Sequence, residues 1–264
     1  MRREMIVLVV VLSATLPVRC RAALGDVVQS FPSPGSWPEG LAWDGCYLWN
    51  ADGYGCAIYV LEPSTGAVVR SYPSPGSFPE GLAFADGYLY NCDWDTHMIY
   101  KLAVSETSLT ILESFPTPGE RAIGLAWDGH RLWHAAWLWH LYAMARDGSL
   151  LNEFTTPDQH PEDLAWDGTN LWLTDWYSAT IYRIDPYSGA VTLSFPSPGV
   201  RSVGLAFDGR YLWNSDTDQA HSGTIFKIDV GMTELPTLTP MTILALCMLL
   251  SVVLLVFART CRWR

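Results

Sequence analysis

The sequence predicts an all-β fold, a five-bladed β-propeller of four-stranded blades. The first observation is an internal repeat, in which a Ser-Phe-Pro-Ser-Pro-Gly segment and its variants recur near residues 30, 71, 114, 154 and 194. The second is that a Gly-Leu-Ala-Trp-Asp-Gly segment, or a variant of it, follows each start. A period of about 40 residues is typical of arrays of identical supersecondary units such as blades.

Each repeat is interpreted as four short strands. In the first repeat the apolar runs cover 40–43, 47–51, 57–61 and 67–70, with Asp-Gly pairs and a Pro-Ser-Thr-Gly turn between them. Runs of about five residues have strand length and are too short for helices. Asp-Gly and Gly-rich clusters also separate strands rather than helices. Four strands in about 40 residues make one propeller blade.

The two ends of the repeat array predict how the ring closes. The fifth repeat stops after its third strand, at 225–230, while residues 25–30 match the fourth strand at 66–71 position by position. We expect the N-terminal strand to complete the last blade, which leaves no open edge between the first and last blades.

Tryptophans at equivalent repeat positions are predicted to form the core between blades, because large aromatic side chains dominate burial. These are Trp43, Trp127 and Trp166 in one series and Trp49, Trp133, Trp172 and Trp213 in the other.

The segments outside the repeats predict export and anchoring. Residues 1–22 have the arginines, apolar run and small-residue cleavage site of a signal peptide. After the propeller, assigned to 23–230, come a Pro/Thr linker at 231–240, an uncharged stretch at 241–258 and a basic tail at 259–264. The uncharged stretch is just long enough for a transmembrane helix, and the arginines place the tail in the cytoplasm. The propeller is therefore expected at the cell surface.

The C-terminal segment also resembles a known sorting signal. Leu235-Pro236-Thr237-Leu238, an apolar stretch and a basic end together are similar to the IPTL-CTERM type of bacterial tail. The lead residue is Leu where that family has Ile. The resemblance implies processing by a sorting enzyme, and a plain membrane anchor explains the same residues.

The charge of the predicted ectodomain limits its partners. Residues 23–240 contain 26 Asp and Glu against 9 Lys and Arg, a net charge of −17. Nucleic-acid binding needs a basic surface, so nucleic acid is excluded as a partner. An acidic domain favours cations or basic partners.

Polar residues recur on one predicted face of the propeller, where the first strand of each blade begins and the second strand ends. Carboxylate, amide and imidazole groups around such a mouth are ligands for a divalent cation, Ca²⁺ or another metal. Repeated Asp residues at strand ends also cap turns, which is the alternative interpretation. The metal candidates are Glu39, Glu80, Glu162, Asn50, Asn91, Asp52, Asp93, Asp175, Asp216 and His134.

Aromatic and histidine side chains occupy the loops of the same face. They are interpreted either as a platform for a sugar or peptide or as packing at the blade edge. The candidates for ligand binding are Trp94, Trp137, Trp139, Trp176, His97, His140, His160 and His221.

The blade pattern Pro-Glu-Gly-Leu-Ala-Trp-Asp-Gly, Leu-Trp-x-x-Asp and Ile-Tyr-x-Ile-Asp-Pro-x-x-Gly resembles a broad propeller superfamily over residues 25–230. It includes NHL-type repeats, glutamine cyclotransferase-like propellers and the gluconolactonase/regucalcin group. The last group implies a divalent metal held by Glu at the start of a first strand and by Asn and Asp at later strand ends. That group has six blades, however, whereas this chain has five repeats.

Three functions are compatible with these residues. The first is a non-enzymatic binding module for a protein, glycan or cell-envelope ligand, favoured because the repeats are degenerate and no single blade is distinctive. The chain also has no nucleophile-elbow, P-loop or zinc-protease motif. The alternative is a metal-dependent lactonase or hydrolase, for which His134 and Ala136 would supply the asymmetry of an active site. The second alternative is a five-bladed lectin that uses the loop tryptophans.

Overall fold

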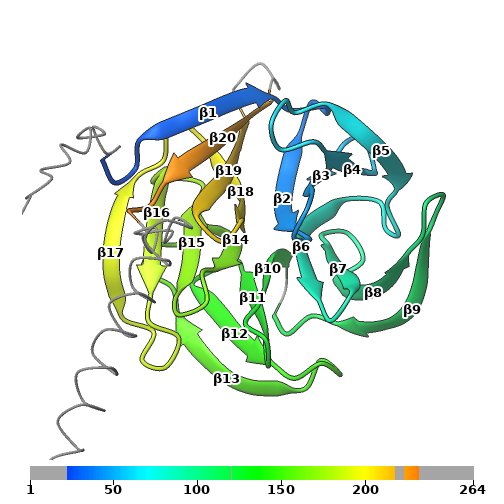
Figure 1. Cartoon of the computed structure of the whole chain (residues 1–264). Coiled ribbons are helices and arrows are strands. Elements are labelled where there is room, and N and C mark those ends of the chain that lie inside the picture. Colours follow the sequence, from blue (N-terminus) through cyan, green and yellow to red (C-terminus); the bar gives the residue numbers. More distant parts are fainter. Residues whose placement is uncertain (1–22, 120, 218–222, 232–264) are drawn as a thin grey trace, which may run out of the picture.

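The computed structural model describes residues 23–119, 121–217 and 223–231, which form a five-bladed propeller of four-stranded antiparallel sheets (Figure 1). The predicted fold class is confirmed. The predicted signal peptide, most of the linker, the segment 241–258 and the basic tail lie outside the described residues. Within the described part of the chain, no helix is long and apolar enough to cross a membrane.

In each blade the first strand lies at the axis and the fourth at the rim (Figure 1). The first blade contains β2 (Pro38–Trp43), β3 (Leu48–Asp52), β4 (Ala57–Leu61) and β5 (Val68–Pro73). The second contains β6 (Pro79–Ala85), β7 (Tyr88–Asp93), β8 (Met98–Val104) and β9 (Leu109–Pro116). The third contains β10 (Ala122–Trp127), β11 (Leu132–Ala136), β12 (His140–Met144) and β13 (Leu150–Thr155). The fourth contains β14 (Pro161–Trp166), β15 (Leu171–Asp175), β16 (Thr180–Ile184) and β17 (Val191–Pro196).

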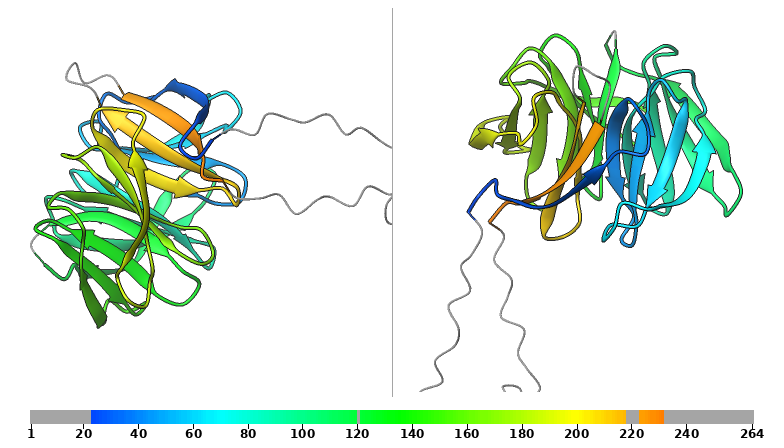
Figure 2. Two further views of the ribbon diagram at one scale, coloured as in Figure 1. Left: turned by 90° about the vertical axis from the view of Figure 1, so that its left-hand side faces the viewer. Right: turned by 90° about the horizontal axis from the view of Figure 1, so that it is seen from above.

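The fifth blade combines both ends of the described chain. It contains β18 (Ser202–Phe207), β19 (Tyr211–Thr217), β20 (Gly223–Asp229) and, as its outer strand, β1 (Val27–Pro32). β1 pairs antiparallel with β20, with Ser30 opposite Phe226. Beyond the ladder, the Gly25 N–H donates to the Asp229 carbonyl at 2.8 Å, so the two ends lie side by side (Figure 2). The predicted closure of the ring is confirmed.

The Trp-Asp-Gly turn of the repeat connects the propeller surface to its core. In the first blade, one oxygen of Asp44 accepts backbone N–H groups of its own turn, and the other accepts the Trp49 indole N–H at 2.8 Å. The third, fourth and fifth blades repeat this arrangement, with indole-to-carboxylate distances of 2.8, 2.9 and 3.0 Å. One carboxylate therefore fixes both the hairpin and the rotamer of a buried indole.

The second blade replaces both partners of this bond. Ala85 and Tyr90 stand at the positions of the Asp and the Trp, and the hairpin is made by Asp86 and Gly87. Both turn residues have positive φ, 51° and 84°, which is the type I′ geometry that an Asp-Gly pair favours. Loss of the acid and loss of the indole thus go together.

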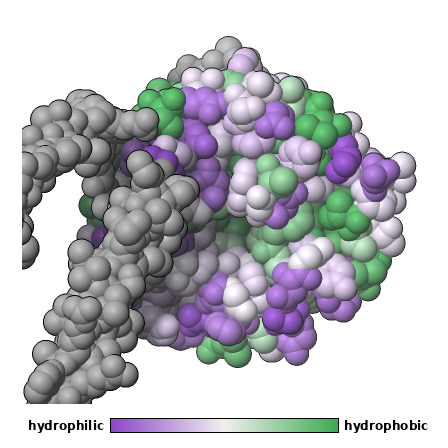
Figure 3. All heavy atoms as spheres, in the orientation of Figure 1, coloured by the Kyte–Doolittle hydropathy of each residue, from purple (hydrophilic) through white to green (hydrophobic). Residues whose placement is uncertain are grey.

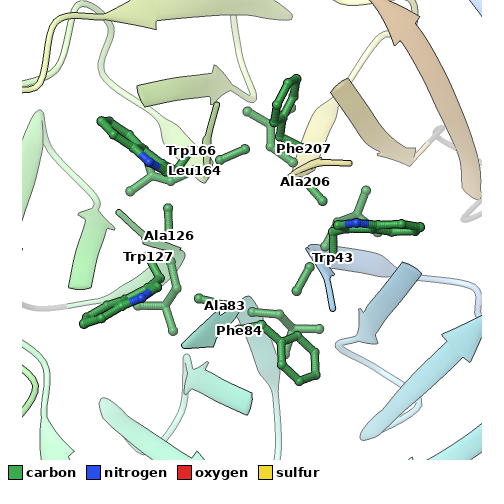
Figure 4. Close-up of a pocket in the computed structure, with 15 residues that line it drawn as sticks. Trp43, Ala83, Phe84, Ala126, Trp127, Leu164, Trp166, Ala206 and Phe207 are labelled. Atoms are coloured by element: carbon green, nitrogen blue, oxygen red, sulfur yellow. The ribbon is translucent and has the colours of Figure 1, made fainter. Parts of the chain in front are cut away.

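The tryptophan core is confirmed for one of the two predicted series. Trp49, Trp133, Trp172 and Trp213 are at most 2% exposed. In the other series, Trp43, Trp127 and Trp166 are partly buried and surround, with Phe84 and Phe207, a small cavity of about 80 Å³ on the axis (Figure 4). A space-filling view from the same side shows a shallow hollow at the centre of this face (Figure 3). We call it the underside.

The axis is closed by an unusual residue of the fourth blade. Four inner strands approach one another at glycines, and an added Cβ on Gly81 would lie 2.5 Å from the Ile123 carbonyl oxygen. The fourth blade has Asp163 at this position. Its carboxylate reaches across the axis and accepts the backbone N–H groups of Leu41 and Leu125 at 3.1 Å and of Leu205 at 2.8 Å. A single acidic side chain therefore bonds to the inner strands of three other blades.

Candidate active site

A pocket of about 330 Å³ opens at the end of the axis opposite the underside. We call this face the mouth. The pocket is formed by the loops that lead into the first strands and by the loops that follow the second strands. Its lining residues are Trp37, Glu39, Phe78, Glu80, Trp94, Asp95, Trp137, Glu162, Trp176, Val203 and Thr217.

Three glutamates form the acidic floor of this pocket. Glu39, Glu80 and Glu162 each stand directly after a proline at the start of an inner strand, and all three line the pocket. One carboxylate oxygen of each lies within 4.8 Å of the other two. Glu39 and Glu80 are only 4% and 5% exposed. The sequence therefore identified three residues from three blades that the fold brings together.

Burial and mutual repulsion raise the pKa values of the three glutamates of the acidic floor. Burial raises the pKa of Glu39 to about 8, even though its carboxylate accepts hydrogen bonds from the Glu80 carboxyl and from Trp37. Burial and the nearby Glu39 charge raise the pKa of Glu80 well above its usual range. The pKa of Glu162 is raised by burial and by Glu39 in the same way. Glu39 and Glu80 therefore share a proton, with Glu80 as its donor.

Aromatic side chains form the walls. The rings of Trp94 and Trp137 meet edge to face, with centroids 5.6 Å apart. Trp137 meets the imidazole of His160 at 5.6 Å, and His160 meets Trp176 at 6.4 Å. The loop tryptophans predicted to bind a ligand thus do line a pocket, except Trp139, which is 42% exposed and is not among the lining residues.

The aspartates at the ends of the second strands have a different use. Each accepts the backbone N–H of the residue 15 positions earlier, in the loop leading into the same blade. These distances are 3.2 Å for Asp52 to Trp37, 2.7 Å for Asp93 to Phe78, 2.8 Å for Asp175 to His160 and 2.6 Å for Asp216 to Arg201. We call these four residues the clamp aspartates, because they hold the lead-in loops in place.

The amides and the histidine two residues before the strand ends are fully buried. Asn50 donates to the carbonyls of Gly40 and Ala51, and Asn91 makes the equivalent bonds. His134 replaces the amide in the third blade and has its Nδ1 3.1 Å from the Gly124 carbonyl oxygen. Burial lowers the pKa of His134 to about 4, so it is neutral at physiological pH. These side chains bond to the backbone of the two inner strands of their own blades and do not line the pocket.

The remaining predicted residues are scattered. His97 is exposed, and His140 forms a 2.7 Å contact with Glu153 at the third blade. His221 lies outside the described residues. Among the described residues, the acidic floor is the one cluster of three or more potential metal ligands. It offers three oxygens, and the clamp aspartates that the gluconolactonase resemblance implied as ligands are held by backbone amides. A metal at this site remains a prediction.

The sequence analysis missed three features of the mouth. Trp37 and Phe78 line the pocket two residues before Glu39 and Glu80, an aromatic-Pro-Glu pattern visible in the repeat. Thr217 is 1% exposed, and its hydroxyl has no hydrogen-bond partner among the described residues. Arg121 stands where the acidic blades carry an aromatic residue or histidine, and its guanidinium stacks on Trp137.

Comparisons with known proteins support an enzymatic family. A family model described as glutamine cyclotransferase matches residues 6–204. Among solved structures, the glutaminyl cyclase of Myxococcus xanthus superposes with a TM-score of 0.66 at 16% identity, over 78% of this chain and 97% of that one. An inactive variant of Staphylococcus aureus virginiamycin B lyase with quinupristin gives a TM-score of 0.45 at 20% identity, over 75% and 68% of the two chains. No curated protein matches the sequence.

Proposed function

The chain belongs to the glutamine cyclotransferase family, and from this premise we propose that the mouth pocket cyclises N-terminal glutamine to pyroglutamate with release of ammonia. The observation that carries the proposal is the buried, proton-sharing pair Glu39 and Glu80 at the base of an aromatic pocket. Glutaminyl cyclase activity is a property of the Myxococcus protein, and its transfer to this chain rests on the chemistry of these residues.

The reaction requires two proton movements that such a pair supplies. The α-amine attacks the side-chain carbonyl carbon, a C–N bond forms, and the bond to the amide nitrogen breaks. The incoming amine loses a proton, and the departing nitrogen gains one and leaves as ammonia. With a pKa of about 8, the Glu39 carboxylate matches an α-amino group of pKa about 7.7–8.0, so proton transfer between them is nearly isoenergetic. The Glu80 carboxyl is the donor to the leaving nitrogen.

The rest of the pocket suits an N-terminal residue. A cationic α-ammonium is attracted both by the acidic floor and by the faces of indole rings. Trp37, Trp94 and Trp176 supply such faces, and they exclude water from the reacting groups. The Thr217 hydroxyl is buried, lines the pocket and has no partner among the described residues, which supports a role as a hydrogen-bond partner for the amide of the substrate.

The test is ammonia release from a glutaminyl peptide by the purified full-length chain, with mass spectrometry to detect the cyclised product. We expect turnover by the native protein, and a loss of about 10²–10⁴-fold in kcat for Glu80→Gln. Asp95→Asn is the matched control, because Asp95 lines the same pocket but is exposed and bonds to Ser77. An active Glu80→Gln variant, or a native protein with no turnover of any glutaminyl peptide, would refute the proposal.

A second candidate is the non-enzymatic binding module that the sequence favoured. Large apolar side chains at the mouth rim are exposed, among them Tyr54 at 64%, Leu138 at 50% and Tyr177 at 79%. Such a rim supports docking of a peptide or protein without turnover. Tight binding of an N-terminal peptide together with absence of product would favour this candidate. The lactonase and lectin hypotheses stay predictions, to be checked with a lactone panel and a glycan array.

We also propose that the domain acts outside the cytoplasm, attached to the membrane. The supporting observations are the sequence patterns at 1–22 and 241–258 and the adjacency of Gly25 and Asp229, which starts both flanking segments from one place. Protease added to intact cells should remove the propeller, while the membrane fraction retains a tag placed after residue 264. Protection of the propeller in intact cells would contradict this location.

A further inference from the structure

Arg121 forms a cationic site at the edge of the pocket. Its guanidinium carbon lies 3.9 Å from the ring centroid of Trp137 and 4.5 Å from that of Trp94, so the cation rests against two walls of the pocket. Within the described residues, its N–H groups form no hydrogen bond or ion pair. By contrast, Arg131 and Arg146 are paired with Asp128 and Asp86.

A second cavity of about 450 Å³ lies on the other side of Trp137. Gly119, Arg121, Trp137, Leu138 and His140 line it. Trp137 is thus a shared wall between the proposed site of the N-terminal residue and this second cavity. A substrate chain that leaves the first pocket over Trp137 enters a space that contains Arg121.

The loop that shapes the second cavity is specific to the third blade. Ala136 pairs with His140, so only three residues connect β11 to β12, whereas four residues connect Asp93 to Met98 in the second blade. Leu138 and Trp139 both take positive φ, 65° and 72°, in this tight connection. Two consecutive non-glycine residues in the left-handed region are uncommon and are associated with functional sites.

The chemistry of Arg121 selects a carboxylate. A guanidinium stacked on aromatic rings keeps its in-plane N–H groups available, and their fork matches a carboxylate in a bidentate pair. The indole N–H of Trp137 is also buried and has no partner among the described residues. The mouth therefore combines an acidic floor, which attracts an ammonium group, with the Arg121 guanidinium at its edge.

We propose that Arg121 is a specificity-determining residue that binds a carboxylate on the residue following the N-terminal glutamine. The inference rests on the proposed function for the position of the N-terminus in the first pocket. The carboxylate comes either from an acidic side chain or from the C-terminus of a dipeptide, and the chemistry at Arg121 is the same.

Binding and turnover are measured separately to test this. Alanyl dipeptides lack the reacting amide, so calorimetric titration of the full-length chain with them reports affinity alone. The series is alanyl-glutamate amide, alanyl-alanine with a free C-terminus, alanyl-alanine amide and alanyl-lysine amide. We expect one or both carboxylate-bearing ligands to bind about tenfold more tightly than the neutral amide. The first two ligands identify the source of the carboxylate.

Variants attribute the preference to one residue. Arg121→Ala should abolish it, and Arg121→Lys should keep a part, because lysine keeps the charge but not the fork. Arg201→Ala is the matched control, since Arg201 has the equivalent position, stacks on Trp176 at 5.3 Å and lines neither cavity. Near-UV circular dichroism checks the packing of the tryptophans. If Arg121→Ala changes the circular dichroism signal, the carboxylate preference is judged from Arg121→Lys instead.

The results separate this inference from the proposed function. An equal affinity for all four ligands, no binding of the carboxylate ligands, or a preference that survives in the Arg121 variants overturns the carboxylate site. Turnover of the corresponding glutaminyl dipeptides is followed in parallel. A preference that depends on Arg121 without any ammonia release keeps the carboxylate site and refutes the cyclase.

Discussion

The acidic floor and the clamp aspartates lie on the same face but behave differently. Glu39 and Glu80 are buried, bond to each other and have raised pKa values. Asp93 and Asp175 are equally buried, yet they accept backbone N–H groups of their own loops. The floor glutamates face the pocket and one another, whereas the clamp aspartates are engaged by the backbone of their own loops. Depth alone therefore does not separate the two sets, and the groups that each carboxyl contacts do.

The largest expected effect is the loss of activity when one glutamate of the acidic floor is replaced. Glu39→Gln should reduce kcat by about 10²–10⁴-fold, because the base of the proposed cyclisation is lost. The melting temperature should stay the same or rise, since a buried ionisable group is replaced by a neutral amide of similar shape. Ammonia release and thermal unfolding measure the two effects. A variant that loses stability and activity together would place Glu39 with the clamp aspartates instead.

The next effect concerns Asp163. Like the floor glutamates it is buried, and like the clamp aspartates it accepts backbone N–H groups. Asp163→Asn should destabilise the fold by about 3–5 kcal/mol, because one amide N–H₂ would face buried N–H donors across the axis. Chemical unfolding measures the change. A loss below about 1 kcal/mol would show that the axis does not depend on this carboxylate.

A smaller effect follows from breaking one clamp. Asp93→Ala removes the acceptor of the Phe78 and Thr96 N–H groups, at 2.7 and 2.9 Å, and should cost about 2–3 kcal/mol. Because the lead-in loop holds Phe78 two residues before Glu80, kcat/KM should fall modestly while the pH dependence of kcat keeps its shape. A changed pH profile for kcat would mean that Asp93 takes part in the proton transfer.

The last effect is the dependence of stability on pH. The raised pKa values of Glu39 and Asp163, both about 8, mean that the folded state binds more protons than the unfolded chain between about pH 4 and pH 8. Their contribution to stability is fully present below that window and is lost as the pH rises through it. Unfolding at pH 5 and pH 8 measures this loss. Glu39→Gln should flatten the curve, and an unchanged curve would contradict the raised pKa.

The repeat predicted the fold because every level of the sequence agreed. The period, the Asp-Gly turns and the complementary ends all indicated a closed five-bladed ring, and the pairing of β1 with β20 confirms it. The convergence of Glu39, Glu80 and Glu162 followed from their equivalent positions. Equivalent positions could not, however, distinguish these glutamates from the clamp aspartates, since both sets recur with the same period.

Some of the features that the sequence analysis missed are departures from the repeat. Asp163 replaces a glycine, and a three-residue connection follows Ala136. Each of these departures alters a single blade, and its structural effect depends on the residues of other blades that contact it. Such contacts across the axis are set by the closed ring and cannot be obtained from a pattern within one repeat.

Asp163 has a consequence for how a chain of this kind can arise by duplication. Five copies of a blade with glycine at this position would leave three buried N–H donors without an acceptor. Five copies with aspartate would crowd five carboxylates into a space that one fills. A ring of five identical blades would therefore have unfavourable contacts at its axis. A closed ring of this kind is therefore more stable with one acidic copy among its blades than with none or with five.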